Sequence, residues 1–179
     1  MMGTPVASSR FKIPSGESLS STMRKLNFFS TPAKTGDRVV EPVQVLARLP
    51  KIANARCLDL GCGQGNTTRL IADALGATEC VGVDFDAGLV EYASAQVNPA
   101  GVSFQQGDVT RLAFPDASFD VVFCRYLLVH LADPMSGVRE MLRVVRPSGY
   151  VVAYEPDFVG EFSDPESSAL ALINRVCAR

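Results

Sequence analysis

A glycine-rich turn constrains the fold of this chain more than any other feature. Gly61, Gly63 and Gly65 follow the short apolar run 56–60, and residues 66–75 carry apolar side chains at helical spacing. A run of this length is typical of a buried strand. Glycine permits a tight turn and lets a ligand come close to the backbone. The sequence therefore predicts a strand, a ligand-accessible turn and a helix, in that order.

The same alternation of strand and helix continues along the chain. Parallel strands need a crossover that returns the chain to the same end of the sheet. We therefore expect an α/β fold, a doubly wound, Rossmann-like and mostly parallel sheet with helices on both faces. The further strands are expected at residues 80–83, 102–106, 119–124 and 150–154, and the further helices at 39–49, 87–96, from the N-cap Asp133 and Pro134 to a stop at 147–149, and at 165–177.

Composition narrows the class of protein. A chain of 179 residues with 47% hydrophobic residues has the length of one domain and can bury a core. Its 17 basic and 19 acidic residues give a net charge of -2, so no general footprint for nucleic acid is visible. No apolar stretch approaches the ~18 residues of a membrane span. The five cysteines form no Cys-x-x-Cys pair and His130 is the single histidine, so we expect no metal site.

The first residues differ from the rest in composition. Residues 1–37 contain 17 Gly, Pro, Ser or Thr and only two acidic residues. We expect a flexible arm or lid there, with a short helix around 19–29, followed by a domain over 38–179. The location is expected to be cytoplasmic. A serine-rich, acid-poor start is also typical of a mitochondrial transit peptide, so the mitochondrion is the alternative.

The spacing of the turn favours an amino-acid ligand over a dinucleotide. A dinucleotide-binding turn reads Gly-x-Gly-x-x-Gly, and its third glycine would stand where Asn66 stands. Here the pattern is Gly-x-Gly-x-Gly, and Asp59 precedes it by two residues. The N-terminus of the following helix attracts a carboxylate as well as a phosphate. The charge of Asp59 suits a ligand that also carries an ammonium group and would repel a pyrophosphate.

Residues at the next strand ends suit a nucleoside. Asp84 ends the second strand, where a carboxylate can accept hydrogen bonds from both hydroxyls of a ribose. Phe85 can cover one face of a purine. After the third strand, Asp108 can accept from the exocyclic amine of adenine, and Val109 can offer its backbone N–H. Together the strand ends predict a ligand that contains an amino acid, a ribose and an adenine.

Short motifs over roughly residues 40–157 carry a family resemblance. They are residues 58–65, 83–84, 107–108, 114–120, 130–134 and 142–149. In order and spacing they resemble the class I S-adenosylmethionine-dependent methyltransferases, in the small-molecule branch that contains the ubiquinone and menaquinone methyltransferases. The resemblance implies S-adenosyl-L-methionine as the cofactor, a methionine-binding loop at Asp59, Gly61, Gly63 and Gly65, a ribose contact at Asp84, an adenine contact at Asp108 and Val109, and Arg125 and Tyr126 beside the sulfonium and the methyl acceptor.

The activity that this resemblance implies is transfer of a methyl group to an O, N or C atom of a small organic molecule by in-line displacement. The sulfonium already supplies a good leaving group, so the protein mainly contributes proximity and orientation. His130 is the candidate catalytic base if the acceptor is a phenol or an alcohol. Glu155 and Asp157, expected after the fifth strand, are candidates for a base or a substrate anchor.

Each of these interpretations has an alternative. The glycines can form a plain tight turn, Asp84 and Asp108 can be turn or cap residues, and His130 can bond the following loop. At the level of function, the alternatives are a methyltransferase-like binding module without catalysis and an NAD-dependent oxidoreductase.

The chain departs from the family after the fifth strand. Only 24 residues follow Glu155, whereas class I methyltransferases continue with a helix and an antiparallel pair of strands. We therefore expect the C-terminal antiparallel strands to be missing and the chain to be a fragment or a short form. The sheet would then have an exposed edge beside strand 150–154, where a partner or a second copy could pair.

Overall fold

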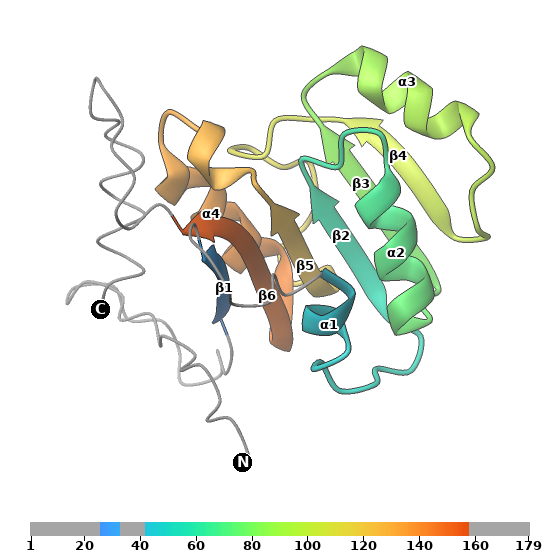
Figure 1. The fold of residues 1–179 in the computed structure, drawn as a ribbon, viewed down its shortest axis with the longest axis horizontal. Helices are drawn as coiled ribbons and strands as arrows, with labels where there is room; N and C mark the ends of the chain where they lie inside the picture. The colour runs from blue at the N-terminus through green and yellow to red at the C-terminus, as the bar shows by residue number, and fades with distance from the viewer. Residues whose placement is uncertain (1–25, 33–41, 158–179) are drawn as a thin grey trace.

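The computed structural model describes residues 26–32 and 42–157, which form one six-stranded sheet with helices (Figure 1). The strands lie in the order β1-β6-β5-β2-β3-β4, and every neighbouring pair is parallel. The strands are β1 (Leu26–Pro32), β2 (Arg56–Leu60), β3 (Glu79–Asp84), β4 (Val102–Gln106), β5 (Phe119–Arg125) and β6 (Val145–Asp157), and the helices are α1 (Pro42–Leu46), α2 (Asn66–Leu75), α3 (Ala87–Ala95), the 3-10 turn η1 (Leu128–His130) and α4 (Pro134–Val144).

The expected α/β fold with a parallel sheet is confirmed. The central strands β2 and β5 are buried at all but one position each, as expected for strands covered on both faces. Val138 and Met141 of α4 pack on one face of the sheet, together with η1. Leu46 of α1 and Ile71 of α2 pack on the other. Figure 1 shows α1 and α2 on the near side of the sheet and α4 on the far side.

The strand order reverses beside the glycine turn. From β2 the chain builds outward through β3 and β4, and it then returns to the other side of β2 to add β5 and β6. In open α/β sheets, ligands bind outside the carboxyl ends of the strands at such a reversal of strand order. The turn after β2 lies at this point, between the ends of β3 and β5.

Three helix ends have clear capping residues, and that of α4 was expected. Gly76 ends α2 in the left-handed conformation, with φ 59°. Asp133 caps α4 by accepting a hydrogen bond from Met135 N, and Pro134 occupies the first turn. Asp86 caps α3 in the same way, accepting from the N–H groups of residues 88 and 89. These signals fix where each helix begins or ends because they satisfy backbone groups that the helix itself leaves unpaired.

The segment Leu26–Pro32 is a strand, so the expected helix around 19–29 is wrong in its described part. β1 pairs with β6 from Leu26 opposite Val151 to Pro32 opposite Asp157. A short apolar run cannot be assigned to helix or strand by periodicity alone, and here the partner strand decides. β1 also covers the side of β6 that was expected to be an open edge, which removes the reason for expecting a partner there. The boundary at residue 37 and the expected helix 165–177 lie outside the described residues.

The expected stop at residues 147–149 lies inside β6, and α4 ends earlier, at Val144. Phe119 pairs with Val145 but Val121 pairs with Tyr150, so residues 146–149 of β6 stand opposite the single residue Asp120. This bulge explains why a Pro-Ser-Gly sequence occurs within a strand. Asp120 is buried there, accepts from Arg56 N at 2.8 Å and forms an ion pair with Arg146.

Two further findings concern the described ranges 26–32 and 42–157. No helix in them is long and apolar enough to cross a membrane. Nor do three or more His, Cys, Asp or Glu side chains gather there as metal ligands would. The compartment stays a prediction.

Candidate functional site

The glycine turn is hydrogen-bonded to the end of β3. The N–H groups of Gly61 and Cys62 both donate to the carbonyl oxygen of Val83, at 2.8 and 3.1 Å, and Gly65 N donates to Cys62 O at 2.9 Å. Gly61, Gly63 and Gly65 have φ of 68°, 52° and 78°. This left-handed conformation costs little only for glycine. The turn is therefore a fixed backbone structure at the carboxyl end of β2.

The three glycines differ in what surrounds them. A Cβ on Gly61 would lie 2.9 Å from a side-chain carbon of Leu127, and one on Gly65 would lie 2.5 Å from the ring of Phe104. A Cβ on Gly63 would meet nothing within 4 Å. Packing inside the protein thus accounts for two of the glycines. Gly63 instead faces open space.

Arg69 of α2 stabilises the turn through hydrogen bonds from its side chain. Its guanidinium donates to Gln64 O at 2.7 Å and to Asn66 Oδ1 at 3.0 Å, and it lies over the ring of Phe104 at 5.8 Å. Asn66, which stands where a dinucleotide-binding turn has its third glycine, therefore takes part in fixing the turn. Sequence reasoning missed Arg69, because its spacing on α2 gives no signal of the loop that it binds.

Asp84 connects the turn to the start of α3. Its Oδ2 accepts a hydrogen bond from Gly63 N at 2.7 Å, and its Oδ1 accepts from Asp86 N at 3.0 Å. Each carboxylate oxygen has a second acceptor position, so both can still accept from ribose hydroxyls. One N–H of the turn is already bonded to this carboxylate, which disfavours a pyrophosphate at the same place.

Asp59 lies beneath the turn and is only 1% exposed. Its carboxyl accepts a hydrogen bond from Thr68 Oγ1 at 2.7 Å. Burial raises the pKa of Asp59 to about 7, against the opposing effects of Thr68 and Arg125. The charge expected beside a ligand ammonium is therefore partly neutralised near pH 7. Asp84, bonded to the turn itself and only partly buried, is the more accessible of the two carboxylates.

The segment after β4 is a tight turn held by Asp108. Asp108 Oδ1 accepts from both the N–H and the hydroxyl of Thr110, at 2.8 and 2.7 Å, and these bonds lower the pKa of Asp108. The turn role that was the alternative for Asp108 is thus present, and the second carboxylate oxygen remains for a ligand. The side chain of Val109 is buried, so only its backbone can contact a ligand. The ring of Phe85 is 75% exposed, as covering a purine would require.

Comparisons with known proteins agree with this arrangement. A family model described as a methyltransferase domain matches residues 58–153. This chain belongs to the methyltransferase domain family. It is 42% identical over 54% of its length to an uncharacterized methyltransferase, YcgJ, of Bacillus subtilis, and 32% identical over 79% of its length to the demethylmenaquinone methyltransferase of Deinococcus radiodurans. The aligned parts span 39% and 55% of those relatives, so the chain matches about half of their length or less.

A solved structure gives the same result for the fold. The crystal structure of an S-adenosylmethionine-dependent methyltransferase from Mesorhizobium loti superimposes with a TM-score of 0.54 at 26% identity, over 62% of this chain and 50% of that one. The resemblance inferred from the sequence motifs is confirmed at the level of the family and the fold. The S-adenosylmethionine dependence of the family also fits a glycine turn followed by carboxylates at the next two strand ends.

On the other side of the turn, this methyltransferase domain places Arg125 and Tyr126 at the end of β5. Tyr126 has φ 52°, its N–H donates to Tyr154 O at 2.9 Å, and its ring lies 5.6 Å from that of Tyr154. The guanidinium of Arg125 lies 5.1 Å from the Tyr126 ring. A positive φ in an aromatic residue is uncommon and marks a strained position. The role of Arg125 and Tyr126 beside the acceptor stays a prediction.

Glu155 fixes the chain that follows Tyr126. Its Oε1 accepts from Leu127 N and Leu128 N at 3.0 and 3.1 Å. Its Oε2 is buried and has no hydrogen-bond partner among the described residues, and burial raises the pKa of Glu155. The expectation that Glu155 follows the last strand is wrong, because it lies within β6 and holds η1 in place. The side chain of Asp157 lies outside the described residues.

His130 ends η1 and its side chain is exposed. Its N–H donates to Leu127 O at 2.9 Å, which is a backbone bond of the 3-10 turn. The role of its imidazole remains a prediction.

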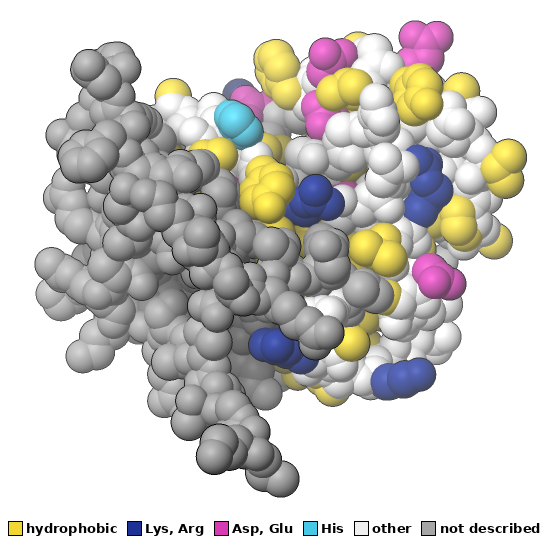
Figure 2. Space-filling view, viewed as in Figure 1, with side chains coloured by type: hydrophobic (Ala, Val, Ile, Leu, Met, Phe, Trp, Pro, Cys, Tyr) yellow, Lys and Arg dark blue, Asp and Glu magenta, His cyan; other side chains and the backbone are white. Residues whose placement is uncertain are grey.

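Charge on the visible face is unevenly distributed. Acidic side chains gather toward the upper edge of the view in Figure 2, above α3 and the strand ends. Such a field opposes a polyanionic ligand and suits a ligand that carries positive charge.

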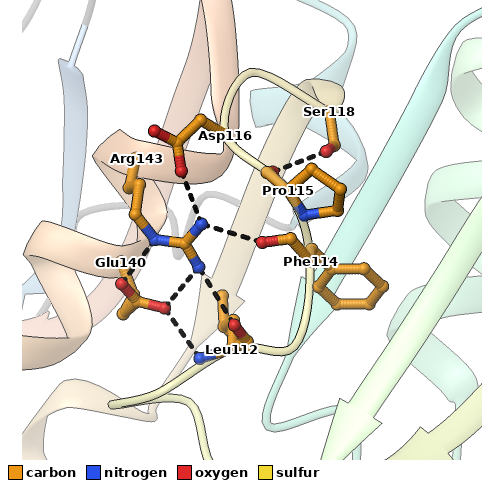
Figure 3. A network of polar contacts seen from close by, with 7 residues as sticks. All are labelled: Leu112, Phe114, Pro115, Asp116, Ser118, Glu140 and Arg143. Carbon is orange, nitrogen blue, oxygen red and sulfur yellow. Dashed lines mark hydrogen bonds and ion pairs between the residues drawn. The ribbon is translucent and has the colours of Figure 1, made fainter.

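Sequence reasoning also missed a polar network that ties α4 to the loop before β5 (Figure 3). At its centre, Arg143 bonds Glu140, Asp116 and two backbone carbonyl groups. The spacing of Glu140 and Arg143 is that of an i,i+3 helix pair, so the pair itself could be found from the sequence. The loop that it binds could not, since that loop lies about 30 residues earlier in the chain.

Proposed function

We propose that this chain binds S-adenosyl-L-methionine in the crevice between the glycine turn and the ends of β3 and β4, and that it transfers the methyl group to a small organic molecule. The observation that carries the proposal is Gly63. Its N–H donates to Asp84 Oδ2 at 2.7 Å, and a Cβ on it would meet nothing within 4 Å. An open stretch of backbone beside the carboxylate at the end of β3 gives a ligand room to contact both.

The residues of the crevice have separate roles in this proposal. The turn at Gly63 receives the amino-acid part of the cofactor, and Asp84 accepts hydrogen bonds from the ribose hydroxyls. Phe85 covers the adenine, while Asp108 and the backbone of Val109 bond its edge. When bound, S-adenosylmethionine supplies a methyl group on a sulfonium leaving group. The protein then contributes mainly the orientation of the reactants, an effect that can reach roughly 7–11 kcal/mol.

We further propose that Arg125 and Tyr126 line the acceptor side and that His130 accepts the proton of a hydroxyl acceptor. His130 is exposed on η1, which follows Tyr126 after a single intervening residue. The relative named demethylmenaquinone methyltransferase supports a small organic acceptor. Incubation with a methyl-labelled donor and a metabolite extract would identify a product. In an assay that measures formation of that product, His130→Gln should lower kcat and remove the rising limb of the profile of kcat against pH. An unchanged profile would exclude His130 as the base.

Calorimetric titration of the purified chain tests the cofactor proposal directly. S-adenosylhomocysteine and S-adenosylmethionine should bind, and NAD should not. Asp84 supports this outcome, because its carboxylate occupies the Gly63 N–H that a pyrophosphate would need. Binding of NAD alone would favour an oxidoreductase. Absence of all binding would favour a non-catalytic module.

A further inference from the structure

We infer that Arg143 and Glu140 of α4 are positioning residues that determine how the site distinguishes adenine from other purines. The inference rests on the proposed binding of S-adenosylmethionine, because it concerns residues 107–112. This segment carries Asp108 and Val109, the two residues proposed to bond the edge of the adenine.

The segment 107–112 is attached at both of its ends. At the first end, Gly107 N donates to Asp84 O at 2.9 Å, so the segment starts from the residue proposed to bind the ribose. At the second end, Leu112 N donates to Glu140 Oε2 at 2.7 Å and Leu112 O accepts from Arg143 Nη2 at 3.0 Å. The position of the adenine contacts therefore depends on β3 at one end and on α4 at the other.

Arg143 uses donors from all three of its guanidinium nitrogens in this attachment (Figure 3). Nε and Nη2 donate to the two oxygens of Glu140, each at 2.7 Å. Nη1 donates to Phe114 O and to Asp116 Oδ1, each at 2.8 Å, and Nη2 also reaches Leu112 O. A guanidinium holds its donors in a fixed planar fork, so these acceptors are fixed relative to one another.

The ion pair between Arg143 and Glu140 is partly shielded from solvent. The side chains of Arg143 and Glu140 are only 31% and 17% exposed, so water and salt screen the pair less than an ordinary surface pair. Arg143 lowers the pKa of Glu140, which keeps the carboxylate charged at neutral pH. The pair is bidentate, the geometry that gives such contacts their directional strength.

The apolar contacts of the same segment cannot replace this attachment. Val109 and Leu112 enter the core on the face covered by α4. Apolar burial is non-directional, so it holds the segment against the core but does not fix the orientation of its polar groups. Discrimination between an amine and a carbonyl at position 6 of a purine requires that orientation. A residue that fixes the orientation of these polar groups therefore affects the selectivity for the purine base more than the overall affinity.

The test compares two ligands that differ at this position. In S-inosylhomocysteine, a carbonyl oxygen replaces the exocyclic amine of S-adenosylhomocysteine, so the donor to Asp108 becomes an acceptor. Calorimetry gives the ratio of the two dissociation constants for each form of the full chain. Arg143→Lys keeps the charge but cannot reach the same set of acceptors. Glu140→Gln is a second, milder variant that keeps the shape of the side chain.

The chain offers a matched control at the opposite end of the sheet. Arg56 donates through Nε and Nη2 to the two oxygens of Glu79, and through Nη1 to Ser118 O. It therefore has the same chemistry as Arg143, but it lies at the amino end of β2, away from the crevice. Arg56→Lys should lower the melting temperature and leave the ligand ratio unchanged.

We expect Arg143→Lys and Glu140→Gln to reduce the preference for the adenosine form by about fivefold, the equivalent of roughly one net hydrogen bond. A ratio unchanged in both variants, with only the melting temperature lowered, would overturn the inference and leave the proposed function intact. A wild-type chain that binds both ligands equally would also overturn it. A wild-type chain that binds neither would overturn the proposed function, and the inference with it.

Discussion

The carboxyl ends of the parallel strands form one edge of the sheet, and the two sides of this edge are built differently. On the loop side, which comprises residues 59–66, 84–85 and 107–112, Asp84 accepts through both oxygens and Asp59 accepts from Thr68. On the β5 side, residues 125–131 with Glu155, one buried oxygen has no partner among the described residues and Tyr126 carries a positive φ. A backbone with satisfied polar groups thus faces a segment that contains a strained residue and that Glu155 and Tyr154 O help to hold. Shape is fixed where the proposed cofactor binds and less so where the proposed acceptor binds.

The largest expected effect comes from Gly63→Ala on the loop side. Its added methyl group enters the space assigned to the cofactor, so the affinity for S-adenosylhomocysteine should fall roughly 100-fold, or about 2–3 kcal/mol. The free energy of unfolding should fall by only about 1–2 kcal/mol, the cost of a positive φ in an alanine. Calorimetry and urea unfolding measure the two effects separately.

Gly76→Ala is the matched control for this variant. Gly76 also has a positive φ, 59°, and a Cβ there would also meet nothing within 4 Å, but it lies at the end of α2 away from the crevice. It should cost the same stability and leave affinity unchanged. Equal losses of affinity in the two variants would show that the loop side is not the binding surface.

The second effect is that of Asp84→Asn. The amide keeps the shape of the side chain but loses the charge and one acceptor, so the affinity for S-adenosylhomocysteine should fall roughly tenfold to thirtyfold, or about 1.5–2 kcal/mol. The control is Asp86→Asn, because Asn caps a helix as well as Asp does and α3 should be unaffected. If the two variants bound equally well, Asp84 would serve only to hold the turn.

The loop side could be predicted from the sequence because its residues stand at fixed offsets from strand ends. Gly63 and Asp84 each lie within three residues of the end of an apolar run, and parallel strands bring such ends to one edge. What the sequence did not reveal is that Asp84 binds the turn itself. That bond joins residues 21 positions apart, and only the register of β2 against β3 creates it.

The β5 side could not be predicted to the same depth. Glu155 meets backbone groups 27 and 28 residues earlier in the chain, which no local pattern indicates. The same holds for β1, since its apolar residues fit a helix or a strand until β6 is placed beside them. Local propensity thus gave the central strands and helices but not β1, while long-range pairing gave β1 and the contacts that hold residues 125–131.

The last comparison concerns stability and not affinity, and it compares the buried carboxyls of the two sides through pH. The pKa of Asp59 is raised to about 7 in the folded chain, from an ordinary value of 3.8. Between these values the folded state binds more protons than the unfolded state, so the free energy of unfolding falls as pH rises from about 4 to about 7 and then levels off. The slope from one such group is at most about 1.4 kcal/mol per pH unit. Asp59→Asn should flatten the curve in that window, as urea unfolding at several pH values would show.

Two further variants show which side contributes to this pH dependence. Burial raises the pKa of Glu155 as well, so Glu155→Gln should also remove a loss of stability with rising pH, beginning above the ordinary range of a glutamate. Glu79 has the opposite sign, because Arg56 lowers its pKa, and Glu79→Gln should remove stability that is present above that range and lost on acidification. Suppose that Asp59→Asn left the slope of the free energy of unfolding against pH unchanged and Glu155→Gln abolished it. Only the buried carboxyl on the β5 side would then destabilise the fold when it becomes charged. Thr68 would then be sufficient to keep Asp59 ionised beneath the turn.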